Sequence, residues 1–98
     1  MTTIDIKDGY IKVEGHSGYD VPGKDIVCAA ISILTEATYN YLIVTNNNIE
    51  KEDDDGKFYI IIKGLNETGS KIIEAFKEMI DDIAEQYPEN VRRIKWKN

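Results

Sequence analysis

The chain has 98 residues, a formal net charge of −6, 42% hydrophobic residues and 31% charged residues. This length and composition predict a single globular domain over residues 1–98, large enough for one core. An acidic chain lacks the basic patch with which proteins contact phosphates, so we expect no direct binding of nucleic acid.

Residues 2–15 carry the pattern of a β-hairpin around the two-residue turn Asp8-Gly9. This turn fixes the register and predicts three cross-strand pairs: Ile6 with Ile11, Ile4 with Val13, and Asp5 with Lys12. The apolar pairs share one face and the charged pair lies on the other, so turn, register and hydrophobic pattern agree.

Residues 17–24 are predicted to form a loop, because Gly15, Gly18, Pro22 and Gly23 fall within nine residues. The loop is either a plain connection or a mobile cover. Gly15 and Gly23 at its two ends permit hinge-like changes of φ, which favours the cover.

A helix is predicted from residue 25 or 26 to about residue 43, with Asp25 as its N-cap. Its main apolar stripe consists of Val27, Ala30, Ile31, Leu34, Ala37, Thr38 and Tyr41. Ile26, Ile33 and Tyr39 lie off this stripe, so more than one face is apolar. We therefore expect a homodimer that buries the second apolar face of this helix.

A second hairpin is predicted over residues 49–63, turning at Asp53-Asp54-Asp55-Gly56. Its second strand is apolar on both faces, which is typical of an interior strand. The acidic run lacks the ligand spacing of a calcium loop, so we interpret it as a solvated turn.

A second helix is predicted over about residues 67–86, ended by Pro88, with an apolar stripe of Ile72, Phe76, Met79, Ile80 and Ile83. The segment V-R-R-I-K-W-K is predicted to be a last strand with Ile94 and Trp96 on one face. The element order is then ββαββαβ, an α+β domain with an antiparallel sheet and two packed helices.

The stretch from Gly15 to Ser32 holds the only histidine, His16, and the only cysteine, Cys28. Cys28 falls in the first turn of the predicted helix, where unpaired N–H groups and the helix dipole favour a thiolate. An imidazole within hydrogen-bond reach would complete a Cys–His nucleophile pair. From these two residues alone, packing roles are the simpler interpretation.

The whole stretch resembles the signature of the ribosomal-processing cysteine proteases, the Prp or YsxB-like family. The matching positions are Gly15-His16, Gly23 and Asp25-Ile26-Val27-Cys28-Ala29, with histidine and cysteine twelve positions apart as in that family. The resemblance implies that Cys28 and His16 are the catalytic pair of a homodimeric endopeptidase. It also implies the substrate: the N-terminal extension of a large-subunit ribosomal protein, cut after aromatic residues.

If the resemblance holds, the Cys28 thiolate attacks a peptide carbonyl, and His16 accepts the thiol proton and later protonates the leaving amine. First-turn N–H groups would supply the oxyanion hole. Asp25 is a candidate for orienting the imidazole, although a helix cap is its simpler role, and Asp20 is a weaker candidate. Gly15 and Gly23 are assigned as loop hinges.

Two other functions remain open: a non-catalytic interaction domain of the same fold, and a thiol-based redox or transferase protein, for which the chain has no resolving cysteine. One cysteine and one histidine allow no internal disulfide and no zinc site, so we expect no metal and no cofactor. We also expect a cytoplasmic location, no secretory signal at M-T-T-I-D-I, and no membrane contact, because no apolar run approaches a membrane span.

Overall fold

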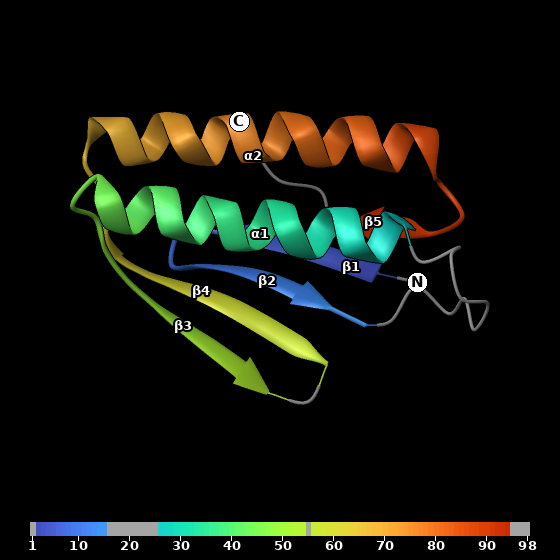
Figure 1. The fold of residues 1–98 in the computed structure, drawn as a ribbon, viewed down its shortest axis with the longest axis horizontal. Helices are drawn as coiled ribbons and strands as arrows, with labels where there is room; N and C mark the ends of the chain where they lie inside the picture. The colour runs from blue at the N-terminus through green and yellow to red at the C-terminus, as the bar shows by residue number, and fades with distance from the viewer. Residues whose placement is uncertain (1, 16–25, 55, 95–98) are drawn as a thin grey trace.

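The computed structural model describes residues 2–15, 26–54 and 56–94. The elements are β1 (Thr2–Lys7), β2 (Tyr10–Glu14), α1 (Ile26–Val44), β3 (Asn48–Asp54), β4 (Lys57–Gly64), α2 (Glu67–Gln86) and β5 (Val91–Arg93), as Figure 1 shows. The predicted ββαββαβ order and the α+β class are confirmed.

One five-stranded sheet contains all the strands in the order β3-β4-β2-β1-β5. The three pairs predicted for the first hairpin are present, and β4 is interior as expected. The sheet is mixed rather than fully antiparallel, because β5 pairs in parallel with β1. The reason is the crossover: α2 carries the chain back along the sheet, so β5 starts at the same end as β4 and β1.

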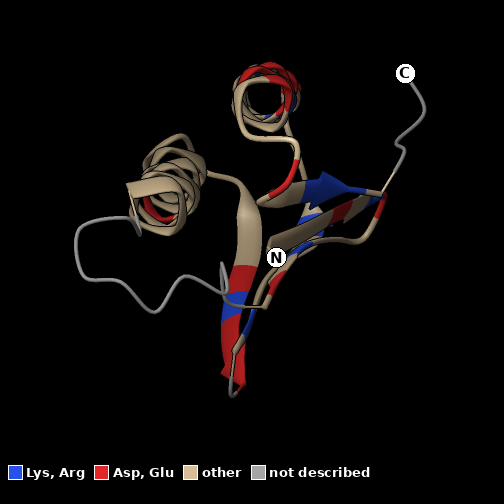
Figure 2. Ribbon diagram, turned by 90° about the vertical axis from the view of Figure 1, so that its right-hand side faces the viewer, with Lys and Arg blue, Asp and Glu red and all other residues tan. Residues whose placement is uncertain are grey.

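Both helices pack on the same face of the sheet, as the end-on view in Figure 2 shows. The core lies between these two layers. Its apolar residues come from every element: Ile4, Ile6, Ile11, Val27, Ile31, Leu42, Ile49, Ile60, Ile73, Phe76, Ile80 and Val91. Each is at most 7% exposed, so burial of apolar surface against the sheet fixes the positions of both helices.

The buried stripe of α1 differs in part from the prediction. It consists of Val27, Ile31, Thr35, Thr38 and Leu42. Ala30 and Tyr41 are exposed, and Tyr39, expected off the stripe, packs partly against the core. Thr35 and Thr38 tolerate burial because their hydroxyls donate to helix carbonyls four residues earlier, at 2.7 and 2.8 Å.

The stripe of α2 is confirmed except at one position. Phe76 and Ile80 are buried and Ile72 and Ile83 pack partly against the core, whereas Met79 is 51% exposed. Ile73, which the prediction left out, is buried. Gly69 is the other buried residue of this helix. Trp96, predicted to share a face with Ile94, lies outside the described residues.

By length and composition α1 is able to span a membrane, with 19 residues and a mean hydropathy of 1.4. The expectation that no apolar run approaches a membrane span is therefore wrong for this helix. A core helix passes the same test, and one such helix is weak evidence for a membrane protein. The apolar character of α1 has a simpler origin, because five of its residues face the core while others face outward.

The side chain of Asn47 joins the end of α1 to the start of α2. Its Nδ2 donates to the carbonyl of Leu42 at 3.1 Å and to Oγ1 of Thr45 at 2.9 Å, and its Oδ1 accepts from the N–H of Asn66 at 2.8 Å. Asn47 is only 8% exposed, so these bonds are largely shielded from water.

Asn66 continues this network as the N-cap of α2. Its Oδ1 accepts from the N–H of Gly69 at 2.8 Å, and its Nδ2 donates to the carbonyl of Thr45 at 2.7 Å. Gly69 packs so closely against the Asn47 amide that a Cβ at this position would collide with it. The two helices are thus held together at one end by two asparagines and a glycine.

We predict that Asn47→Ala lowers the free energy of unfolding by about 1–3 kcal/mol, because it removes the three hydrogen bonds of the amide and leaves the Asn66 N–H without its acceptor. Urea denaturation measures this change. Asn48→Ala is the control, since Asn48 is exposed, and it should change the stability by no more than about 0.5 kcal/mol. Equal losses in the two variants would contradict a structural role for the Asn47 amide.

Candidate functional site

Cys28 is the third residue of α1 and is partly buried, with a free thiol. By helix geometry, the N–H groups of the first turn have no partner within the helix. The thiol therefore lies beside unpaired donors at the positive end of a 19-residue helix. This confirms the predicted start of the helix and places Cys28 in its first turn.

Cys28 lines a hollow of about 220 Å³ that three parts of the chain enclose. The sheet contributes the ends of β1 and β2, α1 contributes its first two turns, and the tip of the β3–β4 hairpin forms the far wall. The lining residues are Thr2, Val13, Gly15, Cys28, Ile31, Ser32, Asp53, Gly56, Lys57 and Phe58. A free thiol therefore faces an open space rather than the core.

Gly15 ends β2 at the edge of this hollow. Its φ is 99°, a left-handed conformation that strains other residues, and its N–H donates to the carbonyl of Gly56 at 3.0 Å. Gly56 has a φ of 83°. This hydrogen bond ties the end of β2 to the tip of the neighbouring hairpin, so two walls of the hollow are held together.

A second hollow of about 190 Å³ continues along α1 from the first. The two share four lining residues, Val13, Ser32, Asp53 and Phe58, and the second adds Thr35 and Glu36. We call the two hollows together the Cys28 groove. It begins at the thiol and runs between α1 and the β3–β4 hairpin for about two helical turns.

Asp53 lies on the side of β3 that faces the helices. It pairs with Phe58 across the hairpin, and both residues line the Cys28 groove. Two residues earlier, Lys51 reaches α1, where it forms an ion pair with Glu36 at 3.8 Å and lies 5.1 Å from the ring centroid of Tyr39. The alternation of the strand therefore directs every second residue of β3 toward α1.

Among the described residues, one lysine lines the groove, and it pairs with a carboxylate on β2. Lys57 forms an ion pair with Glu14 at 3.6 Å, and Glu14 also pairs with Lys12 at 3.2 Å. The hydrogen bond with Lys12, helped by the charge of Lys57, holds the pKa of the Glu14 carboxyl below its ordinary value. Glu14 therefore stays ionised at neutral pH and offsets the charge of Lys57.

Thr2 lines the groove at its Cys28 end. It is 2% exposed, and its buried Oγ1 has no hydrogen-bond partner among the described residues. Its backbone is fixed, since the N–H donates to the carbonyl of Asn90 at 2.9 Å. A buried hydroxyl without a partner costs free energy.

Of the residues predicted for the site, the structure places Cys28 and Gly15, and it brings them to the same hollow. His16, Asp20, Gly23 and Asp25 lie outside the described residues. Within the described parts of the chain, no group of three or more His, Cys, Asp or Glu side chains could hold a metal ion.

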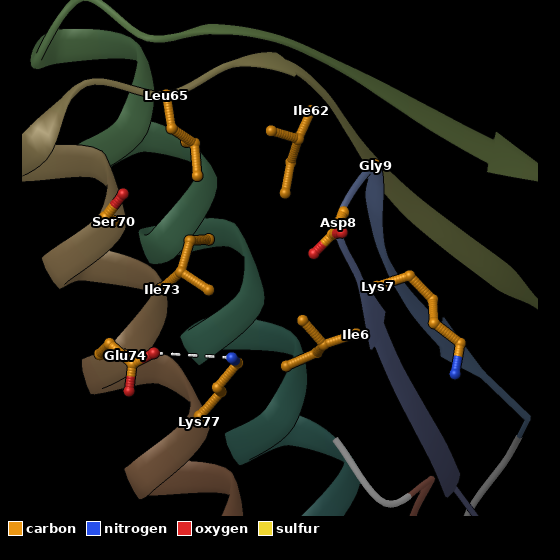
Figure 3. Close-up of a pocket in the computed structure, with 10 residues that line it drawn as sticks. All are labelled: Ile6, Lys7, Asp8, Gly9, Ile62, Leu65, Ser70, Ile73, Glu74 and Lys77. Atoms are coloured by element: carbon orange, nitrogen blue, oxygen red, sulfur yellow. Dashed lines mark ion pairs between the residues drawn. The ribbon is translucent and has the colours of Figure 1, made fainter. Parts of the chain in front are cut away.

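A larger hollow of about 700 Å³ lies at the opposite end of the first hairpin, between α2 and the turn at Asp8 and Gly9. Figure 3 shows that Ile6, Ile62 and Ile73 lie around it, with an ion pair between Glu74 and Lys77 at 3.6 Å on the α2 side. Cys28 does not line this hollow. We therefore do not assign the larger hollow to the chemistry of the thiol.

Sequence reasoning missed Thr2, Phe58 and Asp53 as site residues. Asp53 was assigned to a solvated turn, because the acidic run was considered only as a whole. The available signal was strand alternation, which places Ile49, Lys51 and Asp53 on one face. Thr2 gave no signal, since its role depends on the neighbours that the fold brings to it.

The chain resembles known proteins over nearly its full length. Residues 1–92 match the family model described as cysteine protease Prp. The ribosomal processing cysteine protease Prp of Staphylococcus aureus is 28% identical over 102 residues, covering 94% of this chain and 96% of that protein.

Two crystal structures of the Staphylococcus aureus protease share the fold. One holds a covalently linked product peptide and has a TM-score of 0.77 at 27% identity, over 95% of this chain and 97% of that one. The other holds a substrate peptide and has a TM-score of 0.78 at 25% identity, over 95% of both chains. Because the family model spans 92 of the 98 residues, this chain belongs to the cysteine protease Prp family and is a cysteine protease.

Proposed function

We propose that this enzyme removes the N-terminal extension of a ribosomal protein, with Cys28 as nucleophile and His16 as general base. The observation that carries the proposal is the free thiol of Cys28, which lines an open groove from the first turn of α1. The relative from Staphylococcus aureus is a ribosomal processing protease, and its structures hold substrate and product peptides. These findings support the same substrate class here.

The chemistry proceeds through an acyl-enzyme. His16 takes the thiol proton, and the Cys28 sulfur adds to the scissile carbonyl carbon. The N–H groups of the first turn of α1 stabilise the resulting oxyanion. Collapse of this intermediate breaks the C–N bond, His16 protonates the leaving amine, and the acyl group stays on sulfur as a thioester. Water, deprotonated by His16, then releases the product carboxylate and restores the thiol.

Cleavage after an aromatic residue is part of this proposal. Support comes from the apolar walls of the Cys28 groove, where the partly exposed side chains of Val13 and Phe58 form a surface that an aromatic ring packs against favourably. The roles of Gly15 and Gly23 as hinges, and of Asp25 as the residue that orients His16 or caps α1, belong to the same proposal.

We predict that Cys28→Ala keeps the fold and lowers kcat/KM by at least about a thousandfold, because nucleophilic attack needs the thiolate. The assay follows cleavage of a peptide that spans an aromatic processing site. Circular dichroism and urea denaturation provide the control for folding. Cleavage by Cys28→Ala at the wild-type rate would rule out Cys28 as the nucleophile.

We predict that His16→Ala slows alkylation of Cys28 by iodoacetamide at neutral pH by about tenfold, because the thiol loses the base that draws off its proton. Mass spectrometry measures the rate of alkylation. Ser32→Ala, one turn along α1 from Cys28 in the same groove, is the matched control and should leave the rate unchanged. Equal rates in wild type and His16→Ala would argue against the Cys–His pair.

The assay with wild type and Cys28→Ala also tests the two other functions considered from the sequence. A non-catalytic interaction domain predicts that the wild-type chain binds the ribosomal protein extension and never cleaves it. A thiol-based redox role predicts peroxide reactivity without cleavage. Release of the extension by wild type, and not by Cys28→Ala, excludes both. The reactive thiol also favours a reducing compartment, and we propose a cytoplasmic location on that ground.

We further propose that the enzyme is a homodimer that pairs through α1. Beside the buried stripe, apolar side chains form a seam at three- and four-residue steps: Ile26, Ala30, Ile33, Ala37, Tyr41 and Val44. All of them are exposed except Ala37, which is half-buried. Ile26, Ile33, Tyr41 and Val44 are between 59% and 71% exposed. An apolar seam with this spacing packs well against a second copy of itself.

We predict that Ile33→Glu converts the dimer to a monomer of about 11 kDa without loss of helical content, because a charge in the seam cannot be buried. Sedimentation equilibrium at micromolar concentration measures the mass. Met79→Glu is the matched control, since Met79 is exposed on α2, and it should remain dimeric. A monomeric wild type would contradict the proposal, and binding of wild type to phospholipid vesicles would favour a membrane partner for the seam.

A further inference from the structure

The Cys28 groove contains a carboxylate, that of Asp53, for which the described residues provide no basic partner. Asp53 lines both hollows of the groove from the wall opposite α1. Among the described residues, none forms an ion pair with Asp53, although the other charged residues beside the groove are paired. Glu36 pairs with Lys51 at 3.8 Å, and Lys57 pairs with Glu14 at 3.6 Å.

Asp53 differs from its acidic neighbours in the face of β3 on which its side chain lies. Glu52 and Asp54 add to the acidic end of β3 that Figure 2 shows, but by alternation they lie on the opposite face of the strand. Asp53 alone among the three lines the groove. The Asp53 carboxylate can therefore contact a ligand in the groove. Glu52 and Asp54 act on such a ligand only through long-range electrostatic attraction.

Asp53 and Cys28 line the same hollow of the groove. Thr2 also lines this hollow, but its hydroxyl is buried and is not open to a ligand. A peptide whose scissile bond reaches the Cys28 thiol therefore places its neighbouring residues beside the Asp53 carboxylate.

We propose that Asp53 is a specificity-determining residue, whose carboxylate binds a lysine or arginine side chain that the substrate carries within a few residues of the scissile bond. This inference rests on the proposed peptidase function. It adds a substrate feature that apolar subsites cannot select, because the walls at Val13 and Phe58 recognise size and apolarity only. The enzyme then recognises both an aromatic residue and a basic residue of the peptide in one groove.

The expected size of the preference follows from exposure. Asp53 is exposed at the mouth of the groove, so water and salt weaken the ion pair. A preference of about three- to tenfold in kcat/KM for a basic over a neutral residue is then reasonable. The net charge of −6 adds a general attraction for basic peptides, and this part does not depend on Asp53.

The test uses a set of peptides with one aromatic processing site, in which lysine, glutamine or glutamate replaces each residue in turn within four positions of the scissile bond. Wild type should favour lysine at one or two positions. Asp53→Asn should remove that preference, so that its kcat/KM no longer differs between the lysine and glutamine peptides at those positions. Asp53→Lys should favour glutamate at the same positions.

Glu52→Gln is the matched control, because it removes the same charge from the next residue on the opposite face of β3. It should keep the positional preference for lysine. Binding of the lysine peptide to Cys28→Ala, measured by fluorescence polarisation, should weaken by about three- to tenfold when Asp53→Asn is added. This second readout reports recognition without turnover.

The outcomes separate the two hypotheses. If wild type cleaves the peptides but Asp53→Asn and Glu52→Gln shift the lysine preference equally, the role of Asp53 is wrong and the peptidase function stands. If wild type favours lysine at no position, the inference is also overturned. If wild type neither cleaves nor binds any peptide of the set, the proposed function fails, and the inference fails with it.

Discussion

The buried amide of Asn47 is the constraint on which the placement of the two helices depends. It satisfies backbone groups at the end of α1 and at the start of α2, and Gly69 must lack a side chain for the amide to fit. A helix is stiff and rises about 1.5 Å per residue, so holding α1 at its C-terminal end limits where its first turn can lie. The buried stripe from Val27 to Leu42 fixes its rotation. Cys28 is therefore aimed into the groove by contacts along the whole helix, most of them far from the thiol.

The helix α1 has three faces with different surroundings. The core stripe packs on the sheet and α2, the flank with Cys28 and Ser32 lines the groove, and the seam that includes Ile33 faces outward. A helix with two apolar faces has a high mean hydropathy, which explains why α1 satisfies a membrane-span criterion while serving as a core helix. The groove and the seam lie on separate faces, so association through the seam leaves the thiol open to substrate.

The first hairpin and both helices could be predicted because their signals are local: Asp8-Gly9 defines a turn, and Pro88 follows the last turn of α2. The parallel pairing of β5 with β1 was not predicted, since direction depends on the crossover that precedes the strand. Leu42 and Tyr41 differ by 100° around the helix. Sequence spacing alone assigns Tyr41 to the buried stripe, whereas in the structure Tyr41 is exposed and Leu42 is buried. Cys28 was found from its position in a motif, whereas Thr2 and Asp53 become site residues only when distant segments meet.

The β3–β4 hairpin joins apolar and charged recognition in one structural unit. Asp53 and Phe58 are direct partners across the strands, so the apolar ring and the carboxylate stand side by side on the wall of the groove. The hydrogen bond between Gly15 and Gly56 fixes the tip of this hairpin to the end of β2, and the ion pair of Lys57 with Glu14 reinforces the same junction. Lys57 therefore forms its ion pair on β2, and no described residue forms one with Asp53.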